Sequence, residues 1–218
     1  MTEMAEPAAT RAATTAAATT SQAALDTLLC DVLPRQGDWS DEEYLWLTDH
    51  TCRPIEFTDG YVEELPMPTS THQAILLFLY RLFHDYLHPR GGVAMVSALR
   101  MRVREGKFRE PDLLILRSRS DPRYQDRYWL GADLVAEIVS PDDPERDLVE
   151  KRADYAEAGI PEYWTVDPRD ETVTVLVLRG EAYVEHGVYA RGSSAASALL
   201  DGFAADVAAV FDAAKPST

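Results

Sequence analysis

Two short apolar stretches decide how this chain folds: Glu110-Pro111-Asp112-Leu113-Leu114-Ile115-Leu116 and Leu134-Val135-Ala136-Glu137-Ile138-Val139-Ser140. Each is a run of large apolar residues typical of a buried strand. Each also carries an acidic side chain, which is unfavourable inside a core unless it is paired, protonated or bound to a cation. We therefore expect two neighbouring strands that bring Asp112 and Glu137 together, where they can share a divalent cation.

A basic residue follows one helix further along the chain. Asp147 and Lys151 are four residues apart in a predicted helix, so they share one helix face, and Tyr155 lies one turn beyond them. Asp143 and Pro144 suit the start of this helix, and Gly159 suits its end. A simpler interpretation of Lys151 is a surface lysine paired with Asp147, worth only about 0.2–0.5 kcal/mol.

The surrounding pattern predicts the rest of the core. Residues 70–87 carry apolar side chains at helical spacing. Residues 93–104 and 111–117 predict an antiparallel strand pair with a turn at Gly106, and residues 133–139 predict the third strand. A strand at 162–166 follows the Lys151 helix closely, which implies a parallel pair with a right-handed crossover.

Additional elements are predicted at both ends of this core. Ser40 and Glu43 form a capping-box pattern at a helix start. Hairpins are predicted around Thr58-Asp59-Gly60 and around Arg179-Gly180-Glu181. The order helix, strand, strand, strand, helix, strand, with added hairpins, predicts an α/β protein with a mixed sheet.

Composition bounds the organisation of the chain. Residues 1–24 are mostly Ala and Thr and predict a disordered tail, residues 25–212 a single domain, and residues 213–218 a C-terminal tail. A short helix is possible at residues 25–33. Cys30 and Cys52 are too few for a disulfide framework, and no apolar run is long enough to span a bilayer, so we expect a cytoplasmic protein.

The charge of the chain is negative overall but unevenly distributed. A net charge of −16 argues against coating nucleic acid by bulk electrostatics. Ten of the 21 Lys and Arg residues nevertheless lie between Arg90 and Arg127. Arg100, Arg102 and Arg104 alternate, so on a strand they project from one face. This arginine strip is either a solvated polar face or a surface that contacts DNA phosphates near Asp112.

The site residues suit hydrolysis of a phosphodiester. Asp112 and Glu137 offer oxygen ligands that favour Mg²⁺ or Mn²⁺, and a bound ion of this kind neutralises the phosphate and activates water. Lys151 then orients that water or stabilises the charge that develops on the phosphoryl oxygens. Alternatively, Asp112 pairs with an arginine at its strand start, and Glu137 belongs to a buried Glu–Arg pair.

The same residues resemble a known superfamily. Pro111-Asp112, Glu137-Ile138-Val139-Ser140, Asp147 and Lys151, in this order and spacing, look like the PD-(D/E)XK nucleases. Within them the pattern is most similar to the Uma-two-type putative restriction endonuclease family. Further residues of the pattern are Glu56-Phe57-Thr58-Asp59-Gly60, His72, and Tyr155 to Trp164. The resemblance covers about residues 40 to 212.

This resemblance implies a restriction-endonuclease-like fold and a metal-dependent DNA endonuclease. The superfamily places its basic residue two positions after the glutamate, where this chain has Val139. Similarity to the family implies that Lys151 takes this role, with Glu56, His72, Asp147 and Tyr155 supporting it. His72 is alternatively a structural helix residue, and Glu56 a plain hairpin residue. Cleavage of both strands would be simplest from a C₂ homodimer.

Two other functional classes compete with the nuclease. The first is a binding or assembly protein that keeps the fold and has lost cleavage, which the acidic charge and Val139 favour. The retained trio Asp112, Glu137 and Lys151 favours the enzyme. The second is a metal phosphoesterase acting on small substrates, but the chain has no glycine-rich loop that would cradle a phosphate.

Overall fold

The computed structural model describes residues 33–215. The predicted disordered tail at 1–24, nearly all of the possible helix at 25–33, and Cys30 lie outside the described residues. Cys52 is a free, exposed thiol. No described helix has the length and apolar character needed to cross a membrane.

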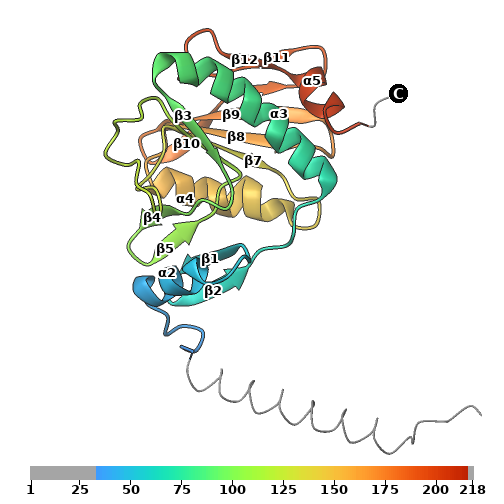
Figure 1. Ribbon diagram of the computed structural model, residues 1–218. Coiled ribbons are helices and arrows are strands. Elements are labelled where there is room, and N and C mark those ends of the chain that lie inside the picture. The colour runs from blue at the N-terminus through green and yellow to red at the C-terminus, as the bar shows by residue number, and fades with distance from the viewer. Residues whose placement is uncertain (1–32, 216–218) are drawn as a thin grey trace, which may run out of the picture.

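A six-stranded mixed sheet forms the centre of the protein, in the order β10-β9-β8-β7-β6-β3 (Figure 1). Its strands are β3 (Val93–Val96), β6 (Leu113–Leu116), β7 (Leu134–Ile138), β8 (Glu162–Asp167), β9 (Thr172–Arg179) and β10 (Ala182–Tyr189). β7 and β8 pair in parallel, and the other neighbours in this sheet pair antiparallel. The predicted mixed α/β fold and the parallel pair across the Lys151 helix are therefore confirmed.

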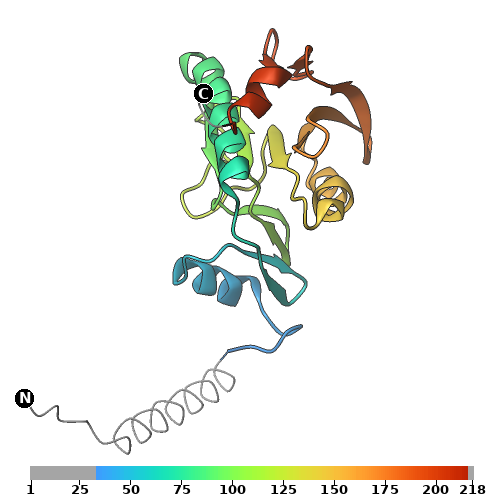
Figure 2. The same ribbon diagram turned by 90° about the vertical axis from the view of Figure 1, so that its right-hand side faces the viewer.

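Helices cover both faces of this sheet (Figures 1 and 2). The long helix α3 (Ser70–Leu87), followed by the 3₁₀ turn η1 (His88–Arg90), packs on one face together with α5 (Val207–Asp212). The helix α4 (Lys151–Glu157) lies on the other. Along β6, Leu113 and Ile115 join the core under α3, whereas Leu114 and Leu116 join the core under α4. This alternation explains why the strand is apolar throughout.

A second, four-stranded sheet lies below the first, in the order β2-β1-β5-β4. It contains β1 (Ile55–Thr58), β2 (Tyr61–Glu64), β4 (Met101–Arg104) and β5 (Lys107–Arg109). The helix α2 (Asp41–Asp49) packs on it through Tyr44, which stacks on Phe57 of β1. The predicted capping box of Ser40 and Glu43 is present, and Asp59-Gly60 forms the predicted hairpin turn with positive φ angles.

The prediction of one strand over residues 93–104 is wrong. Only β3 pairs with β6, and the chain then leaves the central sheet, so that β4 pairs with β5 in the small sheet. Gly106, with φ of +76°, makes the tight turn between β4 and β5 rather than between two core strands. Pro111 has no N–H to continue the ladder and separates β5 from β6.

The chain ends in a small two-stranded sheet and a helix. Strands β11 (Ser194–Ala196) and β12 (Ala204–Asp206) pair antiparallel, and α5 follows directly. Asp206 caps α5 by accepting a hydrogen bond from the Ala209 N–H. The apolar side chains of this region, among them Phe203, Val207 and Val210, join the core under α3.

Candidate functional site

Asp112 and Glu137 meet at the wall of one pocket. Asp112 stands just before β6 and Glu137 lies in β7, and the register that pairs Leu113 with Ala136 places the two acids beside each other. The Asp112 N–H donates to Glu137 Oε2 over 3.3 Å. Glu137 is only 1% exposed. The predicted juxtaposition of these two carboxylates is therefore present.

Asp112 is held by hydrogen bonds from two elements. Its Oδ2 accepts from the Ile138 N–H over 2.8 Å and lies 3.0 Å from His72 Nε2, on the first turn of α3. Burial alone would raise the pKa of Asp112, but the His72 contact, the positive charge of Lys151 and the Ile138 N–H bring it below its ordinary value. His72 therefore belongs to the site, and Asp112 is an anion whose orientation is fixed.

Lys151 is buried between two carboxylates. Its Nζ lies 3.1 Å from Glu137 Oε2 and 3.1 Å from Asp147 Oδ1. Asp147 in turn accepts from the Ser140 N–H, which follows the β7 strand. Burial disfavours the ammonium, but the surrounding carboxylates, Glu137 first among them, raise the pKa of Lys151 above its ordinary value. Lys151 is therefore a charged, buried member of the site and not a surface lysine.

Tyr155 completes this group from the next turn of α4. Its hydroxyl donates a hydrogen bond to Glu137 Oε1. Burial, with added repulsion from Asp112 and Asp147, raises the pKa of Glu137 well above its ordinary value despite the nearby Lys151 charge. Glu137 thus gains from any further positive charge that enters the pocket.

The helix that carries Lys151 departs from the predicted one. The chain is helical from Pro144, as predicted, but Arg146–Glu150 form a π-helical turn before α4 begins. The face bearing Asp147, Lys151 and Tyr155 is buried, whereas Val149 on the other side is 56% exposed. This polar face turns inward because the partners of its charged side chains are buried: Lys151 pairs with Glu137, and Asp147 accepts a hydrogen bond from the Ser140 N–H.

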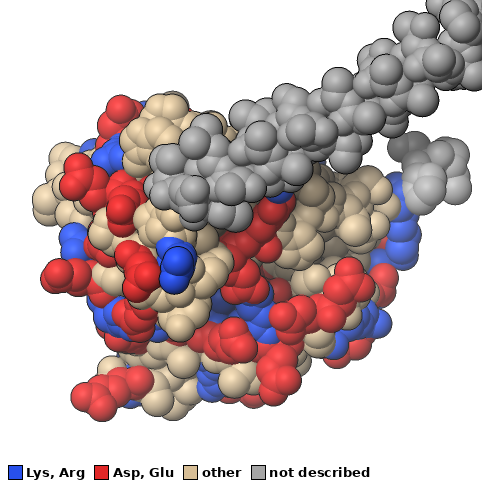
Figure 3. All heavy atoms as spheres, turned by 90° about the horizontal axis from the view of Figure 1, so that it is seen from below, with Lys and Arg blue, Asp and Glu red and all other residues tan. Residues whose placement is uncertain are grey.

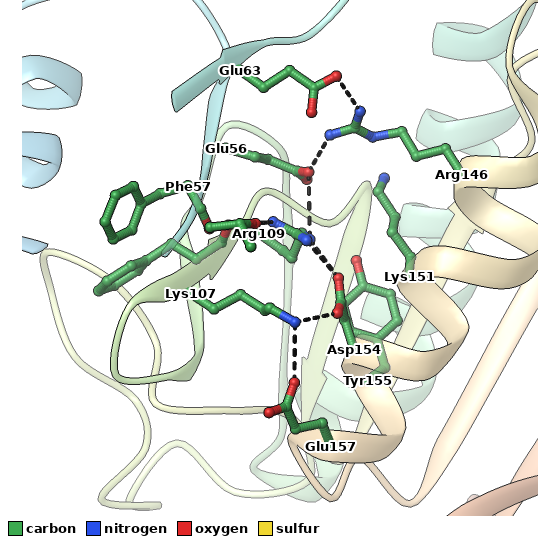
Figure 4. Close-up of polar contacts among 12 residues, drawn as sticks. Glu56, Phe57, Glu63, Lys107, Arg109, Arg146, Lys151, Asp154, Tyr155 and Glu157 are labelled. Atoms are coloured by element: carbon green, nitrogen blue, oxygen red, sulfur yellow. Dashed lines mark hydrogen bonds and ion pairs between the residues drawn. The ribbon is translucent and has the colours of Figure 1, made fainter. Parts of the chain in front are cut away.

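Glu56 reaches the site from the small sheet (Figure 4). It lies in β1, its Oε2 is 2.6 Å from Arg146 Nη2, and its Oε1 accepts from the Glu110 N–H. Burial raises the pKa of Glu56, but Lys151, Arg109 and Arg146 outweigh it, so the net pKa lies below the ordinary value. Glu56 is therefore a buried member of a charged network, not a plain hairpin residue.

This network joins the small sheet to the helix that carries Lys151, as Figure 4 shows. Arg109 of β5 donates to Asp154 of α4 over 2.6 Å. Lys107 of the same strand lies 2.7 Å from Asp154 and 3.1 Å from Glu157. These contacts fix the position of α4 relative to the small sheet, and hence the position of the pocket wall.

Two charged residues in the pocket were missed by the sequence reasoning. Glu110 is buried, its Oε2 has no hydrogen-bond partner among the described residues, and burial raises its pKa to about 7. Its position two residues before Asp112, in the stretch Glu110-Pro111-Asp112, could have identified it. Arg146 also lines the pocket, and no local pattern marks it, because its partners lie far away in the sequence.

Arg102 and Arg104 of the arginine strip lie in β4 of the small sheet, Arg100 directly precedes that strand, and none of the three lines the pocket. Met101 and Val103 face the core between its members, as the alternation predicts. Each strip arginine has an acidic neighbour in the chain itself: Arg100 with Asp49 at 2.8 Å, Arg102 with Asp41 at 3.7 Å, and Arg104 with Asp59 at 2.7 Å and Glu157 at 2.8 Å.

The pocket has a volume of about 410 Å³, with a charged wall and an apolar wall. The apolar wall comes from the segment 65–68 between β2 and α3, with Pro54, Pro141 and Pro168. The pocket is therefore suited to a compact group with a charged and an apolar side.

The surface seen from below has acidic and basic side chains mixed over the visible face, without a continuous basic surface (Figure 3).

Asp112 and Glu137 have the donor chemistry for a hard divalent cation. Within residues 33–215 no group of three or more His, Cys, Asp or Glu side chains is arranged to hold a metal ion. The two carboxylates alone fit Mg²⁺ or Mn²⁺, because Mg²⁺ commonly takes one or two protein carboxylates and completes its shell with water and substrate oxygens. Burial and the carboxylates of Asp112 and Asp147 raise the pKa of Glu137 even beside Lys151, so a further cation at this place would be favourable.

One family model matches most of the chain. Residues 41–208 match the family Uma2, which is described as "Putative restriction endonuclease". A crystal structure of a putative nuclease belonging to DUF820 from Anabaena variabilis ATCC 29413 is similar, with a TM-score of 0.64 and 19% sequence identity. The likeness covers 81% of this chain and 99% of that one, and at this identity it concerns the fold. No curated protein matches the chain.

Proposed function

The chain belongs to the Uma2 family of putative restriction endonucleases, and from this membership we propose that it is a metal-dependent DNA endonuclease that hydrolyses phosphodiester bonds. The family is the one that the sequence motifs resemble. The observation that carries the proposal is the contact between Lys151 Nζ and Glu137 Oε2 at 3.1 Å, beside Asp112 on the same pocket wall. A buried acid pair with a buried lysine is an arrangement suited to phosphodiester hydrolysis.

Asp112 and Glu137 would hold the cation in this proposal, and His72 and Tyr155 would orient them. A bound Mg²⁺ or Mn²⁺ would neutralise the phosphate and lower the pKa of a coordinated water. His72 restricts rotation of Asp112, and the Tyr155 hydroxyl restricts rotation of Glu137. Such fixed orientation matters because ligands that do not reorganise during the reaction stabilise its transition state most effectively.

Lys151 would act on the reacting atoms. It supplies a permanent positive charge next to Glu137, and Asp147 fixes its direction from four residues earlier. In this place its ammonium can orient the attacking water or stabilise the negative charge on the phosphoryl oxygens. Val139, at the position where the superfamily carries its lysine, is buried and apolar, so it takes no part in this chemistry.

We further propose that the substrate is DNA and that a homodimer acts on it in the cytoplasm. A C₂ dimer would present two pockets with the symmetry of the two DNA strands. In the arginine strip, Arg102 and Arg104 keep about a third of their side chains exposed and are our first candidates for contacts with DNA phosphates. Arg100 is less exposed, at 13%, and is the third candidate.

A second candidate function is a binding or assembly protein without cleavage. It is favoured by the net charge of −16 and by the ion pairs that already engage the arginine strip. Strip arginines that are neutralised within the chain have less charge to offer a DNA backbone. The two functions differ in whether bonds in DNA are broken.

Nicking of supercoiled plasmid in Mg²⁺ or Mn²⁺ tests the proposal. We expect the wild type to nick, Asp112→Asn to lose nicking, and Asp85→Asn to keep it, because Asp85 is an exposed acid on α3 outside the pocket. Equal nicking by wild type and Asp112→Asn would place the activity elsewhere. Binding of DNA by the wild type without any nicking would favour the second candidate.

A further inference from the structure

Arg146 is a charged group in the pocket wall that the mechanism above does not use. It stands at the start of the π-helical turn, and its guanidinium is shared by two carboxylates of the small sheet (Figure 4). Nη2 lies 2.6 Å from Glu56 of β1, and Nη1 lies 2.7 Å from Glu63 of β2. Its Nε is buried without a hydrogen-bond partner among the described residues.

The two ion pairs of Arg146 differ in how easily they can be exchanged. The side chain of Glu56 is 1% exposed, whereas that of Glu63 is 64% exposed. An exposed ion pair of this kind contributes only about 0.2–1 kcal/mol, because water and salt compete with it. Glu56 therefore anchors the guanidinium, and Glu63 is a partner that another anion can replace.

The π-helical turn brings Arg146 towards Lys151. Residues five apart lie roughly 140° apart around an ideal α-helix, which would direct these two side chains away from each other. Here the Lys151 N–H bonds to the Arg146 carbonyl, so the two residues are one wide turn apart and both line the pocket. Such π turns are often found at functional sites.

We propose that Arg146 binds a phosphate of the substrate, and that the Glu63 carboxylate occupies the phosphate position in the free protein. This inference rests on the proposed function for the identity of the substrate. Guanidinium groups donate to phosphate oxygens through N–H groups in a fixed plane, and the Arg146 donor that an exposed anion can reach is Nη1, which Glu63 now occupies. A phosphate oxygen is also an anionic acceptor, so it can take the place of the exposed Glu63 carboxylate at Nη1 while Glu56 stays on Nη2.

Matched substitutions in β2 test this exchange. Glu63→Gln removes the competing charge, whereas Glu64→Gln removes the same charge from the next residue, which pairs with Arg53 outside the pocket. The probe is a short fluorescein-labelled DNA duplex without divalent cations, and fluorescence anisotropy gives its Kd. We expect Glu63→Gln to lower the Kd about two- to fivefold, which corresponds to loss of one exposed ion pair. Equal effects of the two substitutions would overturn the proposal.

Substitution of Arg146 should change the Kd in the opposite direction from Glu63→Gln. Arg146→Lys keeps the charge beside Glu56 but loses the planar set of donors, so the Kd should rise about tenfold. Arg146→Gln should in addition reduce the salt slope by about one. Thermal melting identifies any variant that fails to fold. If Arg146→Gln fails to fold, the Kd of Arg146→Lys decides the test. An unchanged Kd for folded Arg146→Lys would overturn the proposal.

The binding experiment is independent of cleavage. If Glu63→Gln binds the duplex more tightly but no variant nicks plasmid in Mn²⁺, the phosphate site stands and the nuclease proposal falls. If plasmid is nicked and the Glu63 and Glu64 variants bind alike, the nuclease stands and the phosphate site falls.

Discussion

At the scale of single residues, the pocket depends on pairing between buried charges. Lys151 is 6% exposed and lies between the carboxylates of Glu137 and Asp147. Burying one charge is costly, and a buried pair is stable only while both members are present. The same lysine lowers the pKa of Glu56, so its charge acts beyond its direct contacts.

Replacement of Lys151 by Met should therefore destabilise the fold strongly. The substitution leaves two carboxylates without their cation, and removal of one partner of a buried pair typically costs about 3–5 kcal/mol. The free energy of unfolding, measured by urea denaturation at neutral pH without divalent cations, should fall by about this amount. Lys215→Met is the control, because Lys215 pairs on the surface. If the free energy of unfolding falls by a similar small amount in both variants, Lys151 contributes no more than a surface lysine does.

At the scale of elements, the small sheet and α4 are joined by ion pairs as well as by the apolar core that Met101 and Val103 share with Tyr155. Glu56 of β1 is central to this contact, since it bonds to Arg146 and lies 3.6 Å from Arg109. Its pKa in the folded protein is below the ordinary value of 4.5. Its charge therefore contributes stability that is complete above pH 4.5 and is lost as the pH falls through the folded value.

Glu56→Gln should remove that contribution and its pH dependence together. At pH 7 we expect the variant to be less stable than the wild type by about 3 kcal/mol, because the buried arginines lose a charged partner. Below the ordinary glutamate pKa the difference should narrow, because the wild-type carboxylate is protonated as well. Urea unfolding from neutral to acid pH measures the stability difference and its pH dependence. Glu64→Gln is the control, because Glu64 is exposed. A difference that stays constant with pH would show that Glu56 titrates normally.

The elements that could be predicted from sequence are those with local signals. α3 follows from its apolar spacing, α2 from Ser40 and Glu43, and β6 and β7 from their apolar runs. The exit of the chain from the central sheet after β3 could not be predicted, because Met101 and Val103 continue the same alternation in the other sheet. Period-two patterns identify a strand but not the sheet that it joins.

The site residues, too, could be predicted only where a local sequence signal marks them. Asp112, Glu137 and Lys151 could be found because acids inside apolar runs and a lysine at helical spacing are visible in the sequence. Arg146 could not, since its contacts with Glu56 and Glu63 span 90 and 83 residues. Pairing of charges over such separations depends on how two sheets are placed, and no single stretch of sequence encodes it.

At the scale of the whole molecule, a cation that binds only the folded pocket should stabilise the entire domain. Mn²⁺ at a hundredfold excess over its Kd would add about 2.7 kcal/mol to the free energy of unfolding. For a domain of this size this corresponds to a rise of several degrees in the melting temperature. We expect this rise for the wild type and its loss in Glu137→Gln, because an amide is a poorer cation ligand. Equal rises, measured by calorimetry, would place the cation away from Glu137.

The bulge in the last strand of the central sheet affects how this protein behaves at high concentration. β10 is an edge strand, and its pairing with β9 shifts register between Glu185 and Gly187. Val184 and Val188 are half exposed on either side of this irregularity. A flat, regular edge with such side chains would offer a template for strand-by-strand aggregation. The bulge interrupts that template, and the charge of Glu185 beside it opposes the stacking of one molecule on the next.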